Sequence, residues 1–170
     1  MQKGKVIKEF GVLPREWKVS FEIKPLRRST KPTNIFHATT GGNKKNHGDR
    51  TPAIFFTKLS TRLLVCSSIN DNPNLCKISP RLPLGKWTKI VVQQIQKEDL
   101  KYYYEIFIND KKKISIVNKK PRIFKNVKYY ASDPFYQAAN AMIRNVVIEK
   151  YQPKGNICLL YTSPSPRDRG

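Results

Sequence analysis

The fold is decided by Trp87-Thr88-Lys89-Ile90-Val91-Val92-Gln93-Gln94, followed after a polar connection by Tyr102-Tyr103-Tyr104-Glu105-Ile106-Phe107-Ile108-Asn109-Asp110. In the second run Tyr102, Tyr104, Ile106 and Ile108 would share one face of an extended strand, with the alternate residues on the other face. Asn and Asp tolerate positive φ, so Asn109-Asp110 suits a two-residue hairpin turn into residues 112–117. The stretch predicts antiparallel sheet with no room for a crossover helix.

The rest of the chain continues this pattern outward. Apolar and polar residues alternate from Trp17 to Lys24, which predicts a strand with one buried and one solvated face. Further short strands are predicted at residues 34–40, 52–57, 61–69, 123–131 and 142–149. About nine such strands with turn signals between them, and no amphipathic helix, predict an all-β fold: an antiparallel β-sandwich of two sheets.

The length of 170 residues suits one domain, which we place at residues 14–150, after an N-terminal extension at 1–13. Residues 151–170 are predicted to be a disordered tail, and 158–168 resemble one translated frame of a sequencing adapter, so we exclude them as an artefact. No apolar run approaches the roughly 20 residues that cross a bilayer. The first residues lack the apolar core of a signal peptide. We expect an extracellular protein whose leader is missing from this sequence.

The chain carries 33 Lys and Arg against 12 Asp and Glu, a formal net charge of +21 at pH 7. This charge favours anionic partners such as sulfated glycans, acidic lipids or nucleic acid. No recognition helix and no glycine-and-aromatic RNA signature accompanies it, which argues against nucleic acid. Charge therefore narrows the class of partner and leaves the fold undecided.

Outside the excluded tail the two cysteines are Cys66 and Cys76, separated by the turn-rich residues 70–74. They could form a disulfide that ties a strand to the loop after it, or remain two buried thiols. We favour the disulfide. Zinc is not indicated, because tight zinc sites need closely spaced ligand pairs and four ligands.

Three segments in this order resemble the laminin-G-like branch of the concanavalin A-like jelly roll. They are residues 82–90, with Trp87 after a small-residue turn, the hairpin at 104–111, and the strand, loop and strand at 127–148. The resemblance implies two packed antiparallel sheets, in a domain type common in extracellular multidomain proteins that bind glycans or proteins, sometimes with calcium. Asp110 departs from the pattern, because such hairpins usually carry glycine there.

Some jelly rolls of this broad class are glycoside hydrolases, which need two carboxylates that converge on a sugar bond. Here Glu98 and Asp99 are adjacent and Glu105 stands alone among tyrosines, so the sequence argues against a hydrolase. His37 and His47 are near no nucleophile in sequence, and we interpret them as packed or solvated. We therefore expect no enzymatic activity.

No cofactor is predicted, and calcium stays open as an alternative. Asp49, Asp71 and Asp133 lie in predicted loops and could offer oxygen ligands. Loop aspartates more often accept hydrogen bonds from the turn backbone.

Basic side chains gather in or beside predicted turns, where they could meet sulfate or carboxylate groups or form a solvated surface without a dedicated partner. The predicted anionic-glycan patch consists of Arg27, Arg28, Lys111, Lys112, Lys113, Lys119, Lys120 and Arg122. Aromatic residues around the bend at 132–134 could form a sugar platform or cap the core. The predicted ligand-binding residues are Lys44, Lys45, Arg50, Asp133, Phe135 and Tyr136.

Three hypotheses of function follow. The first is a non-catalytic extracellular recognition or adhesion domain that binds carbohydrate, including anionic glycan, or a protein partner. The second is a structural spacer within a larger secreted chain, with no ligand of its own. The third is a degenerate glycoside hydrolase, which would require Glu105 to converge with another carboxylate.

Overall fold

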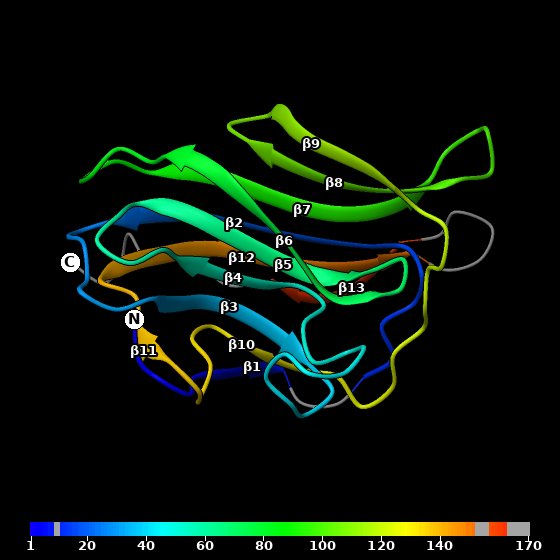
Figure 1. Ribbon diagram of the computed structural model, residues 1–170, viewed down its shortest axis with the longest axis horizontal. Coiled ribbons are helices and arrows are strands. Elements are labelled where there is room, and N and C mark those ends of the chain that lie inside the picture. Colours follow the sequence, from blue (N-terminus) through cyan, green and yellow to red (C-terminus); the bar gives the residue numbers. More distant parts are fainter. Residues whose placement is uncertain (9–10, 152–156, 163–170) are drawn as a thin grey trace.

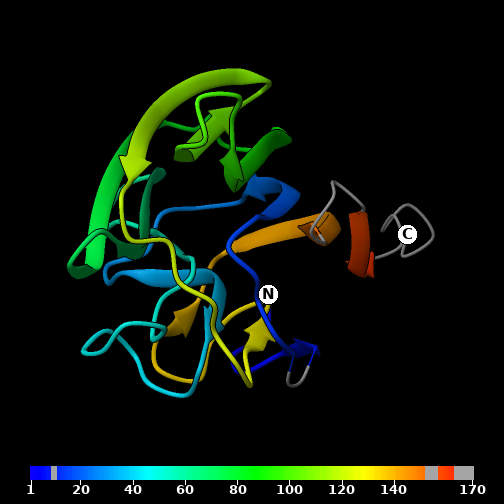
Figure 2. The same ribbon diagram turned by 90° about the vertical axis from the view of Figure 1, so that its right-hand side faces the viewer.

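The computed structural model describes residues 1–8, 11–151 and 157–162, of which 157–161 are described by backbone alone. These residues form two sheets packed face to face (Figure 1), which Figure 2 shows as two curved layers. Strands pair antiparallel throughout, except that β11 (Gln137–Ala138) pairs in parallel with β3. The predicted all-β sandwich of two antiparallel sheets is confirmed.

Each sheet draws its strands from distant parts of the chain. The seven-stranded sheet has the order β1 (Val6–Lys8), β10 (Lys128–Tyr130), β3 (Thr33–Thr39), β4 (Ala53–Phe56), β5 (Arg62–Ile69) and β6 (Asn72–Arg81), with β11 beside β3. The six-stranded sheet has the order β13 (Ile157–Thr162), β12 (Ala141–Tyr151), β2 (Trp17–Pro25), β7 (Thr88–Gln96), β8 (Tyr102–Ile108) and β9 (Lys111–Asn118).

Period-two burial builds the core as predicted. Along β2 every second residue from Trp17 is buried and those between are partly exposed. Phe21 of β2 stacks on Phe36 of β3 with ring centroids 6.3 Å apart, which joins the two sheets. Asn109 and Asp110 have φ values of 49° and 65°, so they form the predicted two-residue turn between β8 and β9. The turn residues and the alternation of apolar residues thus favour the same pairing register of the strands.

Both ends of the chain differ from expectation. The predicted N-terminal extension joins the sandwich, because β1 pairs with β10 and Leu13 is buried in the core. Part of the predicted disordered tail, Ile157–Thr162, pairs with β12 as β13, covering an edge that would otherwise expose unpaired backbone groups. Residues 152–156 and 163–170 of that tail lie outside the described residues, and pairing does not bear on the adapter interpretation.

The strand β6 was expected to be a loop. Its Asn-rich and Pro-containing start resembles turn sequence, and most of its side chains are exposed or partly exposed, as on an edge strand. None of the described residues forms a helix long and apolar enough to cross a membrane.

Candidate functional site

Two loops cover the outer face of the seven-stranded sheet. Phe55 of β4 alternates with the core residues Ile54 and Phe56, so its ring lies on this outer face. The face is nevertheless closed there, since the Arg50 guanidinium lies 4.7 Å from the Phe55 ring centroid and the Tyr136 ring lies 5.0 Å from it. Arg50 comes from the loop between β3 and β4, and Tyr136 from the loop between β10 and β11.

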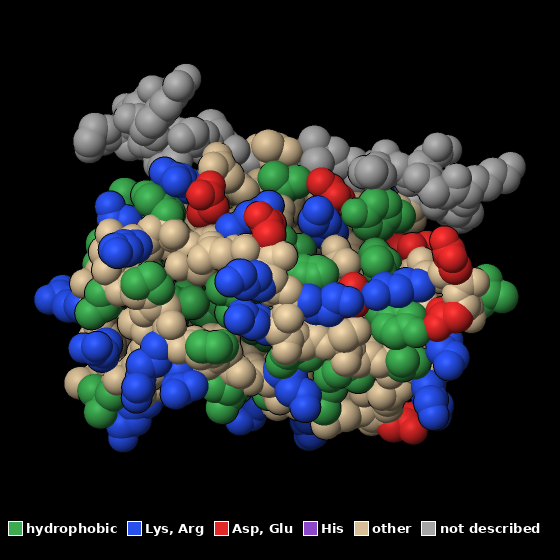
Figure 3. Space-filling model, turned by 90° about the horizontal axis from the view of Figure 1, so that it is seen from above, with side chains coloured by type: hydrophobic (Ala, Val, Ile, Leu, Met, Phe, Trp, Pro, Cys, Tyr) green, Lys and Arg blue, Asp and Glu red, His purple; other side chains and the backbone are tan. Residues whose placement is uncertain are grey.

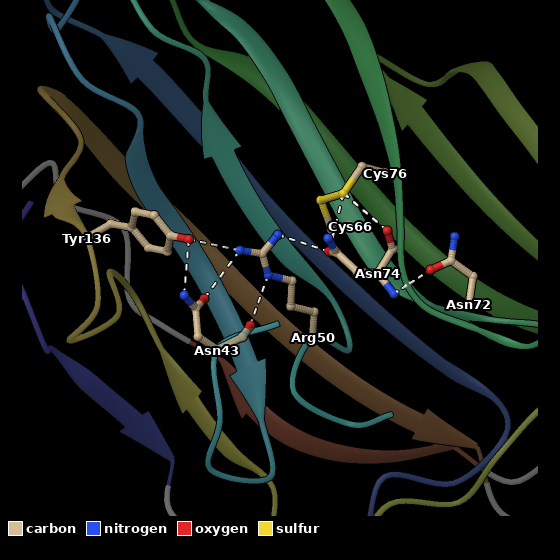
Figure 4. The surroundings of a disulfide bond; sticks show 7 residues. All are labelled: Asn43, Arg50, Cys66, Asn72, Asn74, Cys76 and Tyr136. Carbon is tan, nitrogen blue, oxygen red and sulfur yellow. Dashed lines mark hydrogen bonds between the residues drawn. A yellow bond between two sulfur atoms is a disulfide. The ribbon is translucent and has the colours of Figure 1, made fainter. Parts of the chain in front are cut away.

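Arg50 is the centre of the hydrogen-bond network drawn in Figure 4. Its Nε donates to the Asn43 carbonyl at 2.9 Å, and its Nη2 donates to Asn43 Oδ1 at 3.2 Å and to the Tyr136 hydroxyl at 3.1 Å. Its Nη1 donates to Asn74 Oδ1 at 3.0 Å. Every one of these acceptors is neutral.

The charge of Arg50 is therefore buried without a paired carboxylate. The residue is 4% exposed, and among the described residues no Asp or Glu forms an ion pair with it. Burial lowers the pKa of the Arg50 guanidinium, and contacts with Tyr136 and the more distant charges of Asp133 and Asp49 partly oppose that shift. Arginine stays protonated in proteins, so this is a buried positive charge with no carboxylate in direct contact among the described residues.

Arg50 lines an open pocket of about 310 Å³, at the lower end of the size range of ligand pockets. Lys44 and Lys58 also line the pocket, so it contains two further cations. The remaining lining residues are Pro32, Phe55, Phe56, Thr57, Leu64, Asn74, Cys76 and Tyr136. The pocket therefore combines positive charge with aromatic and amide side chains.

The predicted disulfide between Cys66 and Cys76 is present and borders this pocket (Figure 4). It joins directly opposed residues of β5 and β6, so it links two strands where a strand and a loop were expected. Asn74, the partner of Arg50 Nη1, lies two residues before Cys76.

The loop that carries Arg50 is held by Asp49. Its Oδ2 accepts hydrogen bonds from the backbone N–H groups of Lys45 and Asn46, at 2.9 and 2.8 Å. Gly42 packs against the same carboxylate, where a Cβ atom would lie 2.5 Å from Asp49 Oδ1. The loop therefore depends on glycine at this position.

His37 and Asp133 hold the second loop against the first. His37 Nδ1 is 2.7 Å from Asp133 Oδ2, and His37 Nε2 is 2.5 Å from the Asp49 carbonyl oxygen. Asp133 Oδ1 accepts from the backbone N–H groups of Phe135 and Tyr136. Both His37 and Asp133 are fully buried. The structure thus gives Asp133 a positioning role in place of the predicted ligand contact.

The other predicted ligand-binding residues divide into two groups. Lys44, Arg50 and Tyr136 meet in the pocket, although 86 residues separate the last two. Lys45 is exposed on the same loop but does not line the pocket, and Phe135 is 41% exposed and packs on His37. Sequence reasoning missed Asn43 and Asn74, whose role as acceptors depends on a contact that spacing does not reveal.

The predicted anionic-glycan patch is not a single surface. Its lysines 111–113 begin β9 at the hairpin turn, whereas residues 119–122 follow the opposite end of that strand. Figure 3, which views the molecule from above Figure 1, shows Lys and Arg side chains spread across the surface on that side. Two patch lysines already bind carboxylates: Lys112 pairs with Glu105 at 3.1 Å and Lys120 with Asp71 at 2.7 Å.

Glu105 forms a second buried charge, on the outer face of the six-stranded sheet. Its Oε2 lies 2.9 Å from Lys97 Nζ and accepts a bond from Ser115 Oγ at 3.0 Å, in addition to the contact with Lys112. Burial raises the pKa of Glu105, but hydrogen bonds from Lys97, Lys112 and Gln93 outweigh it and lower the value to about 2. Its hydrogen-bond and ion-pair partners among the described residues include no carboxylate, so the geometry of the hydrolase hypothesis is not seen there.

The aspartates considered for calcium are engaged elsewhere. Asp49 and Asp133 accept backbone hydrogen bonds within their loops, and Asp71 pairs with Lys120. The described part of the chain contains no group of three or more His, Cys, Asp or Glu residues that could hold a metal ion.

No family model and no curated protein matches the sequence, whereas solved structures resemble the fold. A heptameric SAP-like pentraxin from Limulus polyphemus is 13% identical with a TM-score of 0.58, over 84% of this chain and 67% of that one. An alginate lyase mutant in complex with alginate tetrasaccharide is 12% identical with a TM-score of 0.57, over 89% and 79%. The binding domain of botulinum neurotoxin serotype C1 is 16% identical with a TM-score of 0.51, over 78% and 32%.

These likenesses establish the fold and confirm the predicted concanavalin A-like jelly roll. They overturn the prediction that the chain is not an enzyme, because the same fold carries a polysaccharide lyase. The prediction was wrong because it considered only the carboxylate pair of hydrolases and histidines beside a nucleophile, and the absence of both from the sequence argues against those reaction classes alone.

Proposed function

We propose that this chain binds an acidic polysaccharide, with a carboxylate or sulfate group of one sugar seated against Arg50. The observation that carries the proposal is the buried guanidinium whose hydrogen-bond acceptors are all neutral. A buried charge is costly unless it is paired, and a ligand anion would supply a partner in direct contact. The disulfide and the jelly-roll fold support an extracellular setting for this recognition.

The pocket offers the contacts that an acidic sugar needs. Among the described residues Arg50 Nη1 donates one hydrogen bond, to Asn74, so its second N–H could donate to a ligand oxygen. Lys44 at the rim supplies a second positive charge. The partly exposed Tyr136 ring provides an apolar surface beside these charges. Charge would select acidic sugars, and the ring would distinguish a sugar from a free anion.

Calorimetric titration tests the proposal with alginate tetrasaccharide, a neutral cello-oligosaccharide of equal length, and inorganic sulfate. We expect the acidic oligosaccharide to bind most tightly and the neutral one to show no saturable binding. Arg50→Gln should weaken binding about 10- to 100-fold, since a hydrogen bond to a charged group contributes about 1.5–3 kcal/mol. Arg50→Lys should recover only part of the loss, because lysine lacks the planar fork.

Arg81→Gln is the matched control, because Arg81 is exposed, lies outside the predicted anionic-glycan patch and does not line the pocket. It removes the same charge and should leave affinity within about twofold. Equal losses in the Arg50 and Arg81 variants would mean that net charge alone attracts the polymer, and would contradict the proposal.

A further inference from the structure

We infer that the Cys66–Cys76 disulfide, acting through Asn74, positions Arg50, so that acidic-sugar affinity depends on the oxidised state of this bond. The affinity part of this inference rests on the proposed function, whereas the positioning part does not. Arg50 is attached to both strands that the disulfide joins. The Ser68 N–H of β5 donates to the Arg50 carbonyl at 3.1 Å, and Asn74 Oδ1 of β6 accepts from Arg50 Nη1 at 3.0 Å.

The two attachment points lie symmetrically about the disulfide. Ser68 is two residues after Cys66, and Asn74 is two residues before Cys76. Because β5 and β6 are antiparallel with Cys66 opposite Cys76, these two steps run toward the same end of the hairpin. The covalent bond therefore fixes the spacing between the group that holds the Arg50 backbone and the group that holds its side chain.

The turn at this end of the hairpin is tied to the end of β9, because Asn70 bonds to Asn118, Lys119 and Arg122. The strand β6 that follows the turn is less constrained, since it is the last strand of its sheet and pairs only with β5 among the described strands. The pairing of β5 with β6 also shifts register between Ser67 and Ile69, beside the attachment points. Edge strands and irregular pairings open more readily than central strands. Without the disulfide, we expect Asn74 to move relative to Ser68 and Arg50 to lose a fixed acceptor.

The consequence for binding is a loss of preorganisation. Arg50 is held by acceptors from two loops and an edge strand before any ligand arrives. Releasing one of them leaves a long side chain to be ordered during binding. We expect the affinity for an acidic oligosaccharide to fall about three- to tenfold, less than on removal of Arg50 itself.

The first experiment needs no ligand. NMR measures exchange of the Arg50 Nε–H with water in the oxidised protein, in the protein treated with dithiothreitol, and in Asn74→Ala. Dithiothreitol reduces the disulfide to two thiols, becomes a cyclic disulfide itself, and carries no charge that would compete for the pocket. We expect at least threefold faster exchange in the reduced protein and in Asn74→Ala. The backbone amide of Val19 in β2 should keep its protection in both.

Asn46→Ala is the matched control, because Asn46 is an exposed residue of the Arg50 loop and none of the contacts of Arg50 involves its side chain. It should leave Arg50 exchange unchanged. Unchanged exchange in both the reduced protein and Asn74→Ala would overturn the inference. If reduction also exposes the Val19 amide to exchange, the reduced protein has unfolded. The Arg50 exchange rate of oxidised Asn74→Ala then tests whether Asn74 positions Arg50.

The second experiment repeats the alginate tetrasaccharide titration with the same samples. A three- to tenfold weaker binding after reduction and in Asn74→Ala supports the affinity part. Faster Arg50 exchange with equal affinity in all samples contradicts that part while leaving the positioning part intact. Faster Arg50 exchange together with no binding by the oxidised wild type supports the positioning part. That result contradicts the proposed function, and with it the affinity part.

Discussion

The two outer faces of the sandwich each contain a nearly buried charge, and their surroundings differ. Glu105 on the six-stranded sheet is 1% exposed and has Lys97 and Lys112 within 3.1 Å. Arg50 on the seven-stranded sheet is 4% exposed and has only amide, carbonyl and hydroxyl acceptors. The chain itself supplies counterions in direct contact with the first charge and only neutral acceptors in direct contact with the second.

This difference separates a charge that stabilises the fold from one that is suited to binding. A buried charge with an opposite charge beside it is expensive to disrupt, because removing one member leaves the other unpaired. A buried charge without such a partner adds little to stability, since its desolvation cost offsets its hydrogen bonds.

Removing each charge should affect folding unequally. We expect Glu105→Gln to lower the free energy of unfolding by about 2 kcal/mol, less than for a fully buried pair because Lys97 and Lys112 reach solvent. We expect Arg50→Gln to change it by less than about 1 kcal/mol. Urea denaturation of both variants at pH 7 measures these values. A larger loss for Arg50→Gln than for Glu105→Gln would reverse the comparison.

The stability contributed by Glu105 should depend on pH in a defined window. Its pKa is lowered from an ordinary value of 4.5 to about 2, so the folded state favours the ionised carboxylate. The contribution is complete above about pH 4.5 and is lost as the pH falls toward 2. Denaturation at several pH values should therefore show wild type and Glu105→Gln converging across this window. A constant difference would mean that the carboxylate charge contributes nothing.

An exposed ion pair should contribute less to stability than either buried charge. Lys120 and Asp71 lie 2.7 Å apart but both side chains are largely in solvent. We expect Lys120→Gln to leave the melting temperature unchanged within error, because solvent and salt screen such pairs. A clear drop in melting temperature would show that surface pairs contribute here, and that burial does not separate the two classes of charge.

The sandwich was predictable because its signals are local. The alternation that begins at Trp17 and the Asn109-Asp110 turn each depend on neighbouring residues, and both appear in the structure as expected. The strand β6 was not predictable, because an edge strand buries few side chains and its Asn-rich start resembles a loop. Local patterns therefore predict central strands better than edges.

The candidate site was only partly predictable for a related reason. Lys44, Arg50 and Tyr136 were proposed from their residue types, and the fold brings them together. That Asn74 would accept from Arg50, or that Lys97 and Lys112 would enclose Glu105, depends on contacts between separate loops and strands. Glu105 consequently looked isolated in sequence although it is the centre of an ion-pair network.

The absence of a side chain at Gly42 limits how far the loop between β3 and β4 can be altered. Any other residue there would displace the Asp49 carboxylate, which organises the turn immediately before Arg50. An engineer who wished to graft new specificity onto this scaffold could vary the exposed Lys44 and Lys45 freely while leaving position 42 untouched. The lack of a Cβ atom at position 42 thus separates the residues of the loop that can be redesigned from the residue that the loop conformation requires.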